Sequence, residues 1–153
     1  MDAIVAQAMA KWPNVPAVYG WLALDRRGNW RIKGEPIANH ALREFIARNY
    51  EADSAGRWYF QNGPQRVYVS LAYTPLVVHH DGDGLHDHCG RPFAARRSYL
   101  DDAGSVLVQG EGTIALVDDR DLARYADGAS TLQRITVAEV PARFGFVKEP
   151  KAA

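Results

Sequence analysis

The chain has 153 residues and a single cysteine, Cys89, so it cannot form an internal disulfide. Its first residues, MDAIVAQAMAKW, lack both the basic segment and the long apolar run of an export signal. No stretch approaches the roughly 20 apolar residues that a membrane-spanning helix requires. We therefore expect a reduced, cytoplasmic protein that does not cross a membrane.

An excess of charge of one sign is also absent. The sequence has 18 Lys and Arg residues against 18 Asp and Glu, a formal net charge of +0, and no basic run is longer than two residues. Nucleic acids and anionic lipids need clustered basic side chains, so we expect neither as a partner. A chain without net charge does not strongly repel its own copies, which is compatible with a homo-oligomer.

Familiar catalytic motifs are missing as well. The sequence contains no Gly-x-Ser-x-Gly, no glycine-rich phosphate loop before a helix, no His-Glu-x-x-His and no paired-cysteine metal motif. These absences remove the usual evidence for nucleophilic, nucleotide-dependent and zincin chemistry. The composition, 47% hydrophobic and 24% charged, is that of an ordinary globular protein. We expect a single domain over residues 1–153.

Turn signals dominate what is present. An aspartate followed three residues later by glycine favours a type I turn. This pattern occurs five times, at 25/28, 53/56, 81/84, 87/90 and 101/104. Alternating or β-branched segments around these turns predict antiparallel hairpins. The expected strands lie at 19–24, 30–33, 57–61, 66–73, 97–100, 105–109, 113–117 and 135–140.

About three helices are expected between the hairpins. Asp2 can cap a helix that ends near Lys11, and Asp118 or Asp119 can cap one that carries Leu122. Asn39 can cap a helix whose apolar stripe consists of Leu42, Phe45, Ile46 and Tyr50. The sequence therefore predicts an α+β fold of antiparallel hairpins or sheet with about three helices.

Two segments of the chain resemble each other. LDRRGNWRIKGE (24–35) and LDDAGSVLVQGE (100–111) share Leu, Asp, Gly, Gly and Glu in one register, which places Leu24 on Leu100. This match predicts an internal duplication with similar halves at about 12–76 and 92–147, joined by a histidine-rich connector at 77–91. The alternative is that hairpins of one type independently acquire the same turn residues.

The segment VVHHDGDGLHDHCGRP, residues 77–92, holds four of the five histidines. Its two Asp-x-x-Gly pairs are explained as turns, which leaves two interpretations of the imidazoles. The first is a solvated polar connector with no cofactor. The second is a site for zinc or another transition metal, in a metal-binding protein or a metal-dependent hydrolase. Its ligands would be drawn from His79, His80, His86, His88 and Cys89.

A second candidate site is the loop that follows three aromatic residues, Trp58-Tyr59-Phe60. Gln61, Asn62, Gln65 and Arg66 can all form directed hydrogen bonds with a small polar ligand. The structural alternative is that Asn-Gly-Pro only makes a turn while the aromatic residues pack in the core.

Two segments also resemble a known family. KWPNVPAVYGWLALDRRGNW (11–30) and RNYEADSAGRWYFQNGPQRVYVSL (48–71) are similar to the signatures of a small proteobacterial family of unknown function. The order of hairpin, Gly-x-Pro-Ile and helix is similar to another uncharacterised bacterial family with a repeated α+β motif. The resemblance covers about half the chain and fades past the histidines. It implies a small α+β fold with internal repeats, a link to ligand sensing or signalling, and no catalytic residues.

The leading functional hypothesis is a non-enzymatic cytoplasmic module, regulatory or signalling in role, that binds a small molecule or a protein. Gln61, Asn62, Gln65 and Arg66 would lie at the rim of its site. The alternatives are the metal-binding protein or hydrolase described above and a structural homo-oligomer subunit whose aromatic residues form the interface.

Overall fold

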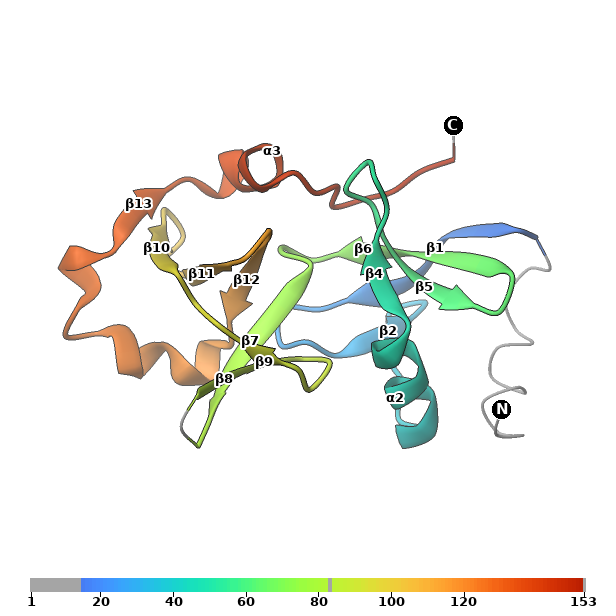
Figure 1. The fold of residues 1–153 in the computed structure, drawn as a ribbon, viewed down its shortest axis with the longest axis horizontal. Coiled ribbons are helices and arrows are strands. Elements are labelled where there is room, and N and C mark those ends of the chain that lie inside the picture. Colours follow the sequence, from blue (N-terminus) through green and yellow to red (C-terminus); the bar gives the residue numbers. More distant parts are fainter. Residues whose placement is uncertain (1–14, 83, 153) are drawn as a thin grey trace. The chain divides into compact units, whose positions relative to one another are not determined.

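The structure is a computed structural model that describes residues 15–82 and 84–152. The predicted helix at 2–11 lies outside these residues. The described chain forms two compact units. Unit 1 spans 15–25, 29–72 and 147–152, and unit 2 spans 26–28, 73–82 and 84–146. Figure 1 labels their helices and strands.

Unit 1 is a six-stranded mixed sheet with one α-helix. Its strands lie in the order β3-β2-β1-β6-β5-β4, and only β1 and β6 are parallel. Leu22 and Phe60 are fully buried in its core. The elements are β1 (Ala17–Leu24), β2 (Trp30–Ile32), β3 (Glu35–Pro36), α2 (His40–Arg48), β4 (Tyr50–Ala52), β5 (Trp58–Asn62) and β6 (Gln65–Leu71).

Helix α2 confirms the prediction at Asn39, whose side chain accepts a hydrogen bond from the Leu42 backbone N–H at 2.9 Å. Leu42 and Ile46 are buried, and the Phe45 ring meets Phe60 of β5 edge to face at 5.4 Å between centroids. The fourth residue of the predicted stripe, Tyr50, is buried too, but it belongs to β4. The amphipathic pattern therefore located the helix and the face that packs on the sheet.

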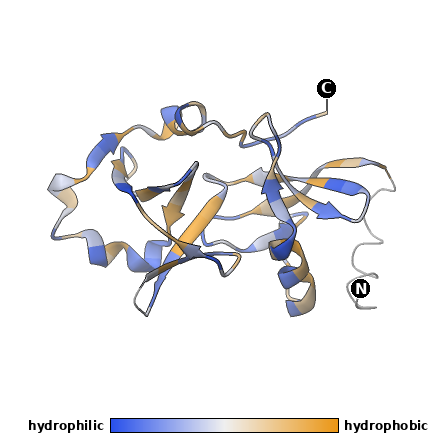
Figure 2. Ribbon diagram, in the orientation of Figure 1, coloured by the Kyte–Doolittle hydropathy of each residue, from blue (hydrophilic) through white to orange (hydrophobic). Residues whose placement is uncertain are grey.

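Unit 2 is a seven-stranded mixed sheet in the order β13-β10-β11-β12-β7-β8-β9. The β7–β12 and β10–β13 pairs are parallel, and the other pairs are antiparallel. Figure 2 shows that β12 and the first part of β7 are strongly hydrophobic, as expected for central strands. The strands are β7 (Leu76–Asp81), β8 (Gly84–Asp87), β9 (Pro92–Phe93), β10 (Arg97–Asp101), β11 (Val106–Gly110), β12 (Thr113–Val117) and β13 (Gln133–Ile135).

The two units share one topology. Each unit contains two three-stranded meanders, and the first strand of the first meander pairs in parallel with the last strand of the second. Strands β1 to β6 of unit 1 therefore correspond in order to strands β7 to β12 of unit 2. When the two units are aligned by their corresponding strands, Trp58 at the start of β5 falls on Val106 at the start of β11. In the same register Gln65 of β6 falls on Thr113 of β12. Asp-x-Ala-Gly precedes both β5 and β11.

The predicted α+β fold with two similar halves is therefore confirmed, but the register that placed Leu24 on Leu100 was wrong. That register aligned the β1–β2 hairpin with the β10–β11 hairpin, which occupies a different place in the topology. The two hairpins share residues because both use an Asp-x-x-Gly turn, which is the convergence named as the alternative. The expectation of purely antiparallel pairing is also corrected, because central parallel pairs join the meanders.

The predicted connector at 77–91 is corrected as well. Its residues form most of β7, all of β8 and the following turn, and Val77 and Val78 are buried in the sheet of unit 2. The Asp81–Gly84 segment is a turn, as predicted, because the two residues pair across the β7–β8 ladder as its first and fourth residues. The positive φ, 59°, lies at Gly82, however, and not at the fourth residue.

The later helices differ from the expectation. Asp118 caps a 3₁₀ helix, η1 (Asp119–Tyr125), in which no residue is buried. Strand β13 ends at Ile135 because Thr136 and Glu139 form a reciprocal capping box, which starts the 3₁₀ helix η3 (Val137–Glu139) and then α3 (Val140–Phe144). Residues 129–131 form a further 3₁₀ turn. Across residues 15–82 and 84–152, no helix combines the length and apolarity needed to span a membrane.

Candidate functional site

A cavity of about 290 Å³ lies in unit 2, beside the turn between β8 and β9. Leu76, Pro92 and Phe93 form apolar walls, and Gly110 leaves room for the Phe93 ring, since a Cβ there would lie 2.9 Å from its Cζ. The remaining lining residues are Asp87, Arg91, Ala94, Arg96, Glu111 and Thr113. A cavity of this size fits a small metabolite, since pockets for drug-sized ligands start at roughly 300 Å³.

Asp87 ends β8 and is the first residue of an Asp-x-x-Gly turn, as predicted. Its Oδ1 accepts hydrogen bonds from the backbone N–H groups of Cys89 at 2.9 Å and Arg91 at 3.0 Å. Gly90 closes the turn with φ 87°. Asp87 is only 4% exposed, yet its Oδ2 makes no hydrogen bond to any described residue. Asp87 therefore lines the cavity with one carboxylate oxygen engaged in the turn and the other without a donor among the described residues.

Thr113 opens β12 on the opposite side of the cavity. Its Oγ1 is buried and has no hydrogen-bond partner within the described part of the chain. An unsatisfied buried hydroxyl costs on the order of 1–3 kcal/mol. Such a group indicates either a structural cost without benefit or a position that a ligand satisfies.

Three charged side chains stand at the outer part of the cavity. Arg91 and Arg96 are exposed, and Arg96 lies 3.5 Å from the Glu111 carboxylate, in a pair whose side chains are 65% and 86% exposed. Such an exposed ion pair contributes little to stability, at most about 1 kcal/mol. Breaking the Arg96–Glu111 pair to bind a ligand therefore costs little free energy. The cavity lining thus combines the buried Asp87 with three exposed charged residues of both signs.

The predicted ligand loop is a tight turn that bonds to itself. The Gln61 side chain donates to the carbonyls of Gly63 at 2.6 Å and Gln65 at 3.2 Å, and the Asn62 amide donates to the Gln65 Oε1 at 3.1 Å. Gln65 in turn donates to the Val15 carbonyl at 2.6 Å, and the Arg66 guanidinium stacks on Tyr59 at 4.3 Å. The structure brings these four residues together, but it uses their polar groups within unit 1. A ligand-binding role for them stays a prediction.

The histidine residues lie on two faces of the β7–β8 hairpin. His79 faces His86 directly across the ladder, whereas His80 points to the other face, where its Nε2 lies 2.9 Å from the Tyr125 hydroxyl. Burial, with Arg124 nearby, lowers the pKa of His80. His88 accepts the Val77 backbone N–H through Nδ1 at 3.2 Å. Two of the predicted ligands therefore already use a ring nitrogen within the fold.

The described residues contain no group of three or more His, Cys, Asp or Glu side chains placed to hold a metal ion. The His79–His86 pair supplies two imidazoles on one face, and the Nδ1 of His86 is buried without a partner in residues 15–82 and 84–152. Zinc or another transition metal at this segment stays a prediction, and elemental analysis of protein purified without a histidine tag is the measurement that tests it.

Cys89 follows the same turn, and burial raises the pKa of its thiol to about 12, with the nearby Asp87 carboxylate acting in the same direction. We expect Ellman's reagent to modify native protein at pH 8 at least about 100-fold more slowly than protein unfolded in urea, because the thiolate is the reactive form. Comparable rates in the two states would contradict this protection and would return Cys89 to the list of reactive thiols.

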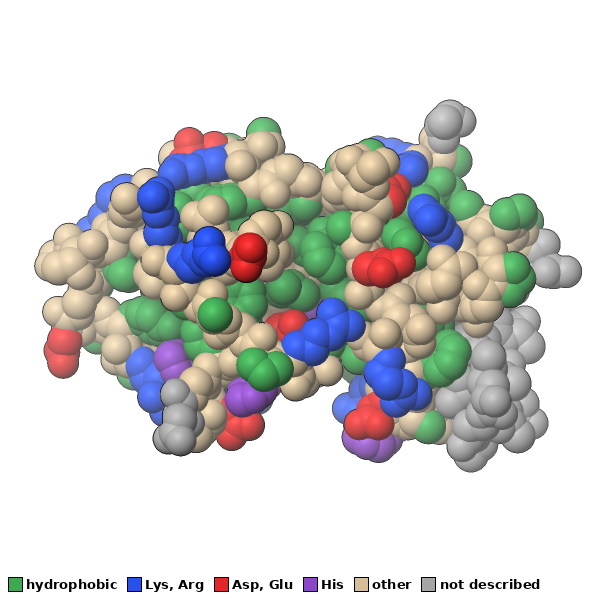
Figure 3. Space-filling model, in the orientation of Figure 1, with side chains coloured by type: hydrophobic (Ala, Val, Ile, Leu, Met, Phe, Trp, Pro, Cys, Tyr) green, Lys and Arg blue, Asp and Glu red, His purple; other side chains and the backbone are tan. Residues whose placement is uncertain are grey.

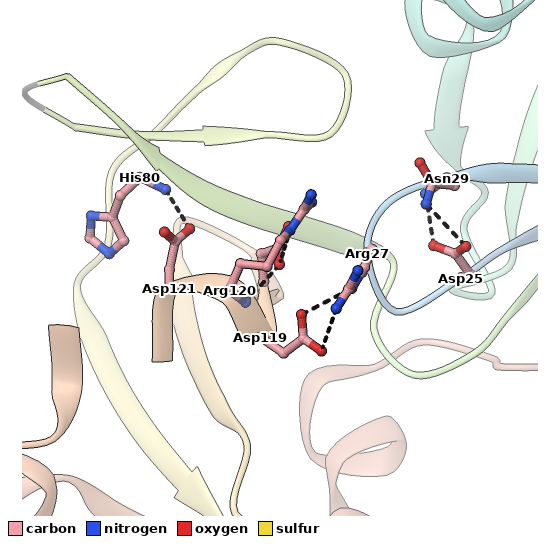
Figure 4. A network of polar contacts seen from close by, with 8 residues as sticks. Asp25, Arg27, Asn29, His80, Asp119, Arg120 and Asp121 are labelled. Carbon is pink, nitrogen blue, oxygen red and sulfur yellow. Dashed lines mark hydrogen bonds and ion pairs between the residues drawn. The ribbon is translucent and has the colours of Figure 1, made fainter. Parts of the chain in front are cut away.

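A polar network surrounds the acidic run that starts η1 (Figure 4). Asp118 is held by Arg120, whose hydrogen bonds lower the pKa of the Asp118 carboxyl to about 2. Asp119 accepts from Arg27 Nε at 3.0 Å, and Asp121 accepts the His80 backbone N–H at 3.0 Å. Each of these carboxylates has a structural partner, so the run is explained by the fold of unit 2.

A second cavity of about 270 Å³ lies between β10 and β13. Asp101 and Asp102 line it, but the Asp101 carboxylate serves the β10–β11 turn and Tyr73, and Asp102 accepts the Val137 N–H at 2.8 Å. The two aspartates of this cavity are therefore committed to the fold. The Asp87 cavity differs because, among the described residues, Asp87 Oδ2 accepts no hydrogen bond and the buried Thr113 Oγ1 has no partner.

Sequence reasoning missed this cavity. Asp87 was assigned correctly to a turn and was then dismissed, while Arg91 and Arg96 carried no motif. No signal in the sequence could have found it, because Arg91 follows Asp87 by four residues in the same way that Arg57 follows Asp53 and pairs with it. Only the tertiary structure shows that Asp87 Oδ2 has no donor among the described residues.

The fold and the cavity together define an α+β protein built from two sheets of the same strand order. The family model DUF2944, described as "Protein of unknown function (DUF2946)", matches residues 1–151, and the chain belongs to this family. The resemblance noted in the sequence is thereby confirmed, and the match extends through the histidine segment, where the sequence resemblance had faded.

Two solved structures show the same fold. A DUF1285 family protein from Silicibacter pomeroyi DSS-3 aligns with a TM-score of 0.56 at 21% identity, over 83% of this chain and 84% of that chain. A DUF1285 family protein from Shewanella baltica OS155 aligns with a TM-score of 0.52 at 13% identity, over 69% and 90%. No curated protein matches this chain. At these identities the likeness concerns the fold alone.

Proposed function

We propose that this protein is a non-enzymatic module that binds a small polar ligand in the cavity of unit 2, in a regulatory or signalling role. The observation that carries the proposal is a cavity lined by Thr113, whose buried Oγ1 has no hydrogen-bond partner among the described residues, and by Asp87, whose Oδ2 accepts no hydrogen bond from them. Buried polar groups in proteins are almost always hydrogen-bonded, so the unpartnered Thr113 hydroxyl at this cavity favours a ligand.

The size and charge of the cavity support a binding role. Its volume of about 290 Å³ is close to the lower end of the range for small-molecule sites, and its charged groups have both signs. Figure 3 shows acidic and basic side chains interspersed within each unit on the face drawn, which agrees with a partner that is not a polyanion. The earlier proposal of a ligand at Gln61–Arg66 is less well supported, because those side chains already bond within the loop.

Thr113→Val provides the test. Valine has the same shape without the hydroxyl, so we expect it to raise the free energy of unfolding of the ligand-free protein by about 1 kcal/mol, because a buried unsatisfied group is removed. The same substitution should abolish or reduce the thermal stabilisation produced by any metabolite that binds the wild type. Urea denaturation and a thermal-shift screen of a metabolite library measure the two effects.

Two controls accompany this screen. Arg66→Gln alters the loop of unit 1 and should leave ligand stabilisation unchanged. A library compound that stabilises the wild type and Thr113→Val equally, but not Arg66→Gln, would contradict the proposed cavity and favour the loop. If no compound stabilises the wild type and Thr113→Val lowers stability, the proposal is wrong.

A further inference from the structure

The β5–β6 hairpin of unit 1 and the β11–β12 hairpin of unit 2 close in the same way, so their side chains can be compared position by position. Asn62 pairs with Gln65 across the first hairpin, and Gly110 pairs with Thr113 across the second. The strand after each turn pairs in parallel with the first strand of its unit. Gln65 and Thr113 therefore occupy equivalent positions in the two repeats.

In unit 1 these positions carry two carboxamides that the fold itself uses. The Asn62 amide donates to the Gln65 Oε1 at 3.1 Å, and the Gln65 amide donates to the Val15 carbonyl at 2.6 Å. The carboxamide of Gln65 thus acts as a hydrogen-bond donor and as an acceptor at the same time. A side chain of the chain's own fills this role beside the hairpin of unit 1.

In unit 2 neither carboxamide is present. Gly110 replaces Asn62, and the Phe93 ring packs against it. Thr113 replaces Gln65 with a shorter side chain, whose buried Oγ1 has no hydrogen-bond partner among the described residues. Both replacements line the cavity of about 290 Å³. Unit 2 therefore has open space and an unsatisfied hydroxyl at the position where unit 1 has a carboxamide.

From this difference, and resting on the proposed function, we infer that the ligand of the cavity carries a primary carboxamide, which takes the role that the Gln65 side chain has in unit 1. The carbonyl oxygen of the ligand accepts a hydrogen bond from the Thr113 hydroxyl, and its NH₂ group supplies the donors. The rest of the ligand packs on the apolar walls that Leu76, Pro92 and Phe93 form.

An uncharged head group fits this lining better than a charged one. An ammonium group has donors only, so it would leave the proton of the Thr113 hydroxyl without an acceptor. A carboxylate would lose its hydration in a cavity that is also lined by Asp87, which is 4% exposed. The Arg96 guanidinium does not offset that cost, because it is exposed and lies 3.5 Å from the Glu111 carboxylate.

The experiment compares matched probes that differ only in the head group. One set is benzamide, benzoate and benzylamine, and the other is 3-methylbutanamide, 3-methylbutanoate and 3-methylbutylamine. Titrations followed by ¹H–¹⁵N NMR give the dissociation constants and show whether the Thr113 resonance shifts. We expect one or both amides to bind at least about tenfold more tightly than the acid and the amine of the same set.

Variants of Thr113 test the equivalence with Gln65. Thr113→Gln should abolish amide binding and raise the melting temperature, because its own carboxamide then fills the cavity. Thr113→Val should weaken the amide at least about fivefold, whereas Thr113→Ser keeps the hydroxyl and should bind like the wild type. Gln65→Thr is the matched control in unit 1: it should lower the melting temperature, since Val15 and Asn62 lose a partner, without changing amide binding.

The outcomes separate this inference from the proposed function. If an acid or an amine binds as tightly as its amide, or if neither amide binds, the assignment of a carboxamide is wrong. A different metabolite whose stabilisation is lost in Thr113→Val would then still support the cavity as a binding site. Folded Thr113→Gln that binds the amides like the wild type would overturn the equivalence on which the inference rests.

Discussion

Replacing Asp101 by alanine should lower the free energy of unfolding by about 3 kcal/mol, the largest effect that we expect among the turn aspartates. Asp101 Oδ1 accepts the N–H groups of Ala103 and Ser105, and its Oδ2 accepts the Tyr73 hydroxyl at 2.8 Å. Asp101 is 4% exposed and Tyr73 is 2% exposed. Alanine therefore removes the turn acceptor and also leaves the Tyr73 hydroxyl without this acceptor where water does not reach it.

The matched control is Asp53→Ala, which removes the same turn bonds in unit 1. There the side-chain partner is Arg57, which is 34% exposed and can be hydrated once Asp53 is gone, so we expect a loss of only about 1 kcal/mol. Urea denaturation followed by circular dichroism measures both. Equal losses in the two variants would mean that the buried Tyr73–Asp101 bond adds nothing beyond the turn itself.

Thr74→Val should destabilise the protein by about 2 kcal/mol, although the same change at Thr113 should stabilise it. Thr74 is 2% exposed, and its hydroxyl donates to the Leu76 carbonyl at 2.7 Å and accepts the Leu116 N–H at 2.9 Å. Valine fills the same space but removes the hydroxyl that serves both backbone groups where β7 begins beside β12.

The sign of the difference between the two threonine variants is the informative quantity. Both changes remove one hydroxyl from a β-branched side chain in unit 2, so propensity and volume effects largely cancel. Equilibrium denaturation of the wild type, the two single variants and the double variant gives both values. If Thr113→Val is as destabilising as Thr74→Val, the Thr113 hydroxyl has a structural partner and the cavity loses the buried unpartnered atom on which the proposal rests.

Local sequence patterns predicted much of the secondary structure because their determinants lie within a few residues. The Asn39 cap places its oxygen on the backbone N–H of Leu42, less than one helical turn away, and the stripe of Leu42 and Ile46 requires only helical spacing. The five Asp-x-x-Gly segments became turns for the same reason. At Asp81–Gly84 the positive φ lies at Gly82, the second residue, whereas in the other four it lies at the glycine in the fourth position.

The candidate site was not predictable in this way. Asp87 and Thr113 lie on different strands, far apart in the chain, and what distinguishes them is a partner that is missing, which no local pattern reveals. The histidine segment is a different case. Its density of imidazoles is conspicuous in the sequence, and strand alternation sends His79 and His80 to opposite faces, while metal binding there stays a prediction.

By itself the sequence determined the class of the protein: an α+β chain of short hairpins, repeated once, with turns at aspartate and glycine and a helix after Asn39. These features depend on backbone preferences and side-chain periods that act over a few residues. Tertiary structure alone decided that β1 pairs with β6 and β7 with β12, and hence that the true repeat places β5 on β11 and β6 on β12. Parallel pairing and the hydrogen-bond partners of buried oxygens depend on contacts between residues far apart in the chain, because only a packed core excludes the water that would otherwise satisfy those oxygens.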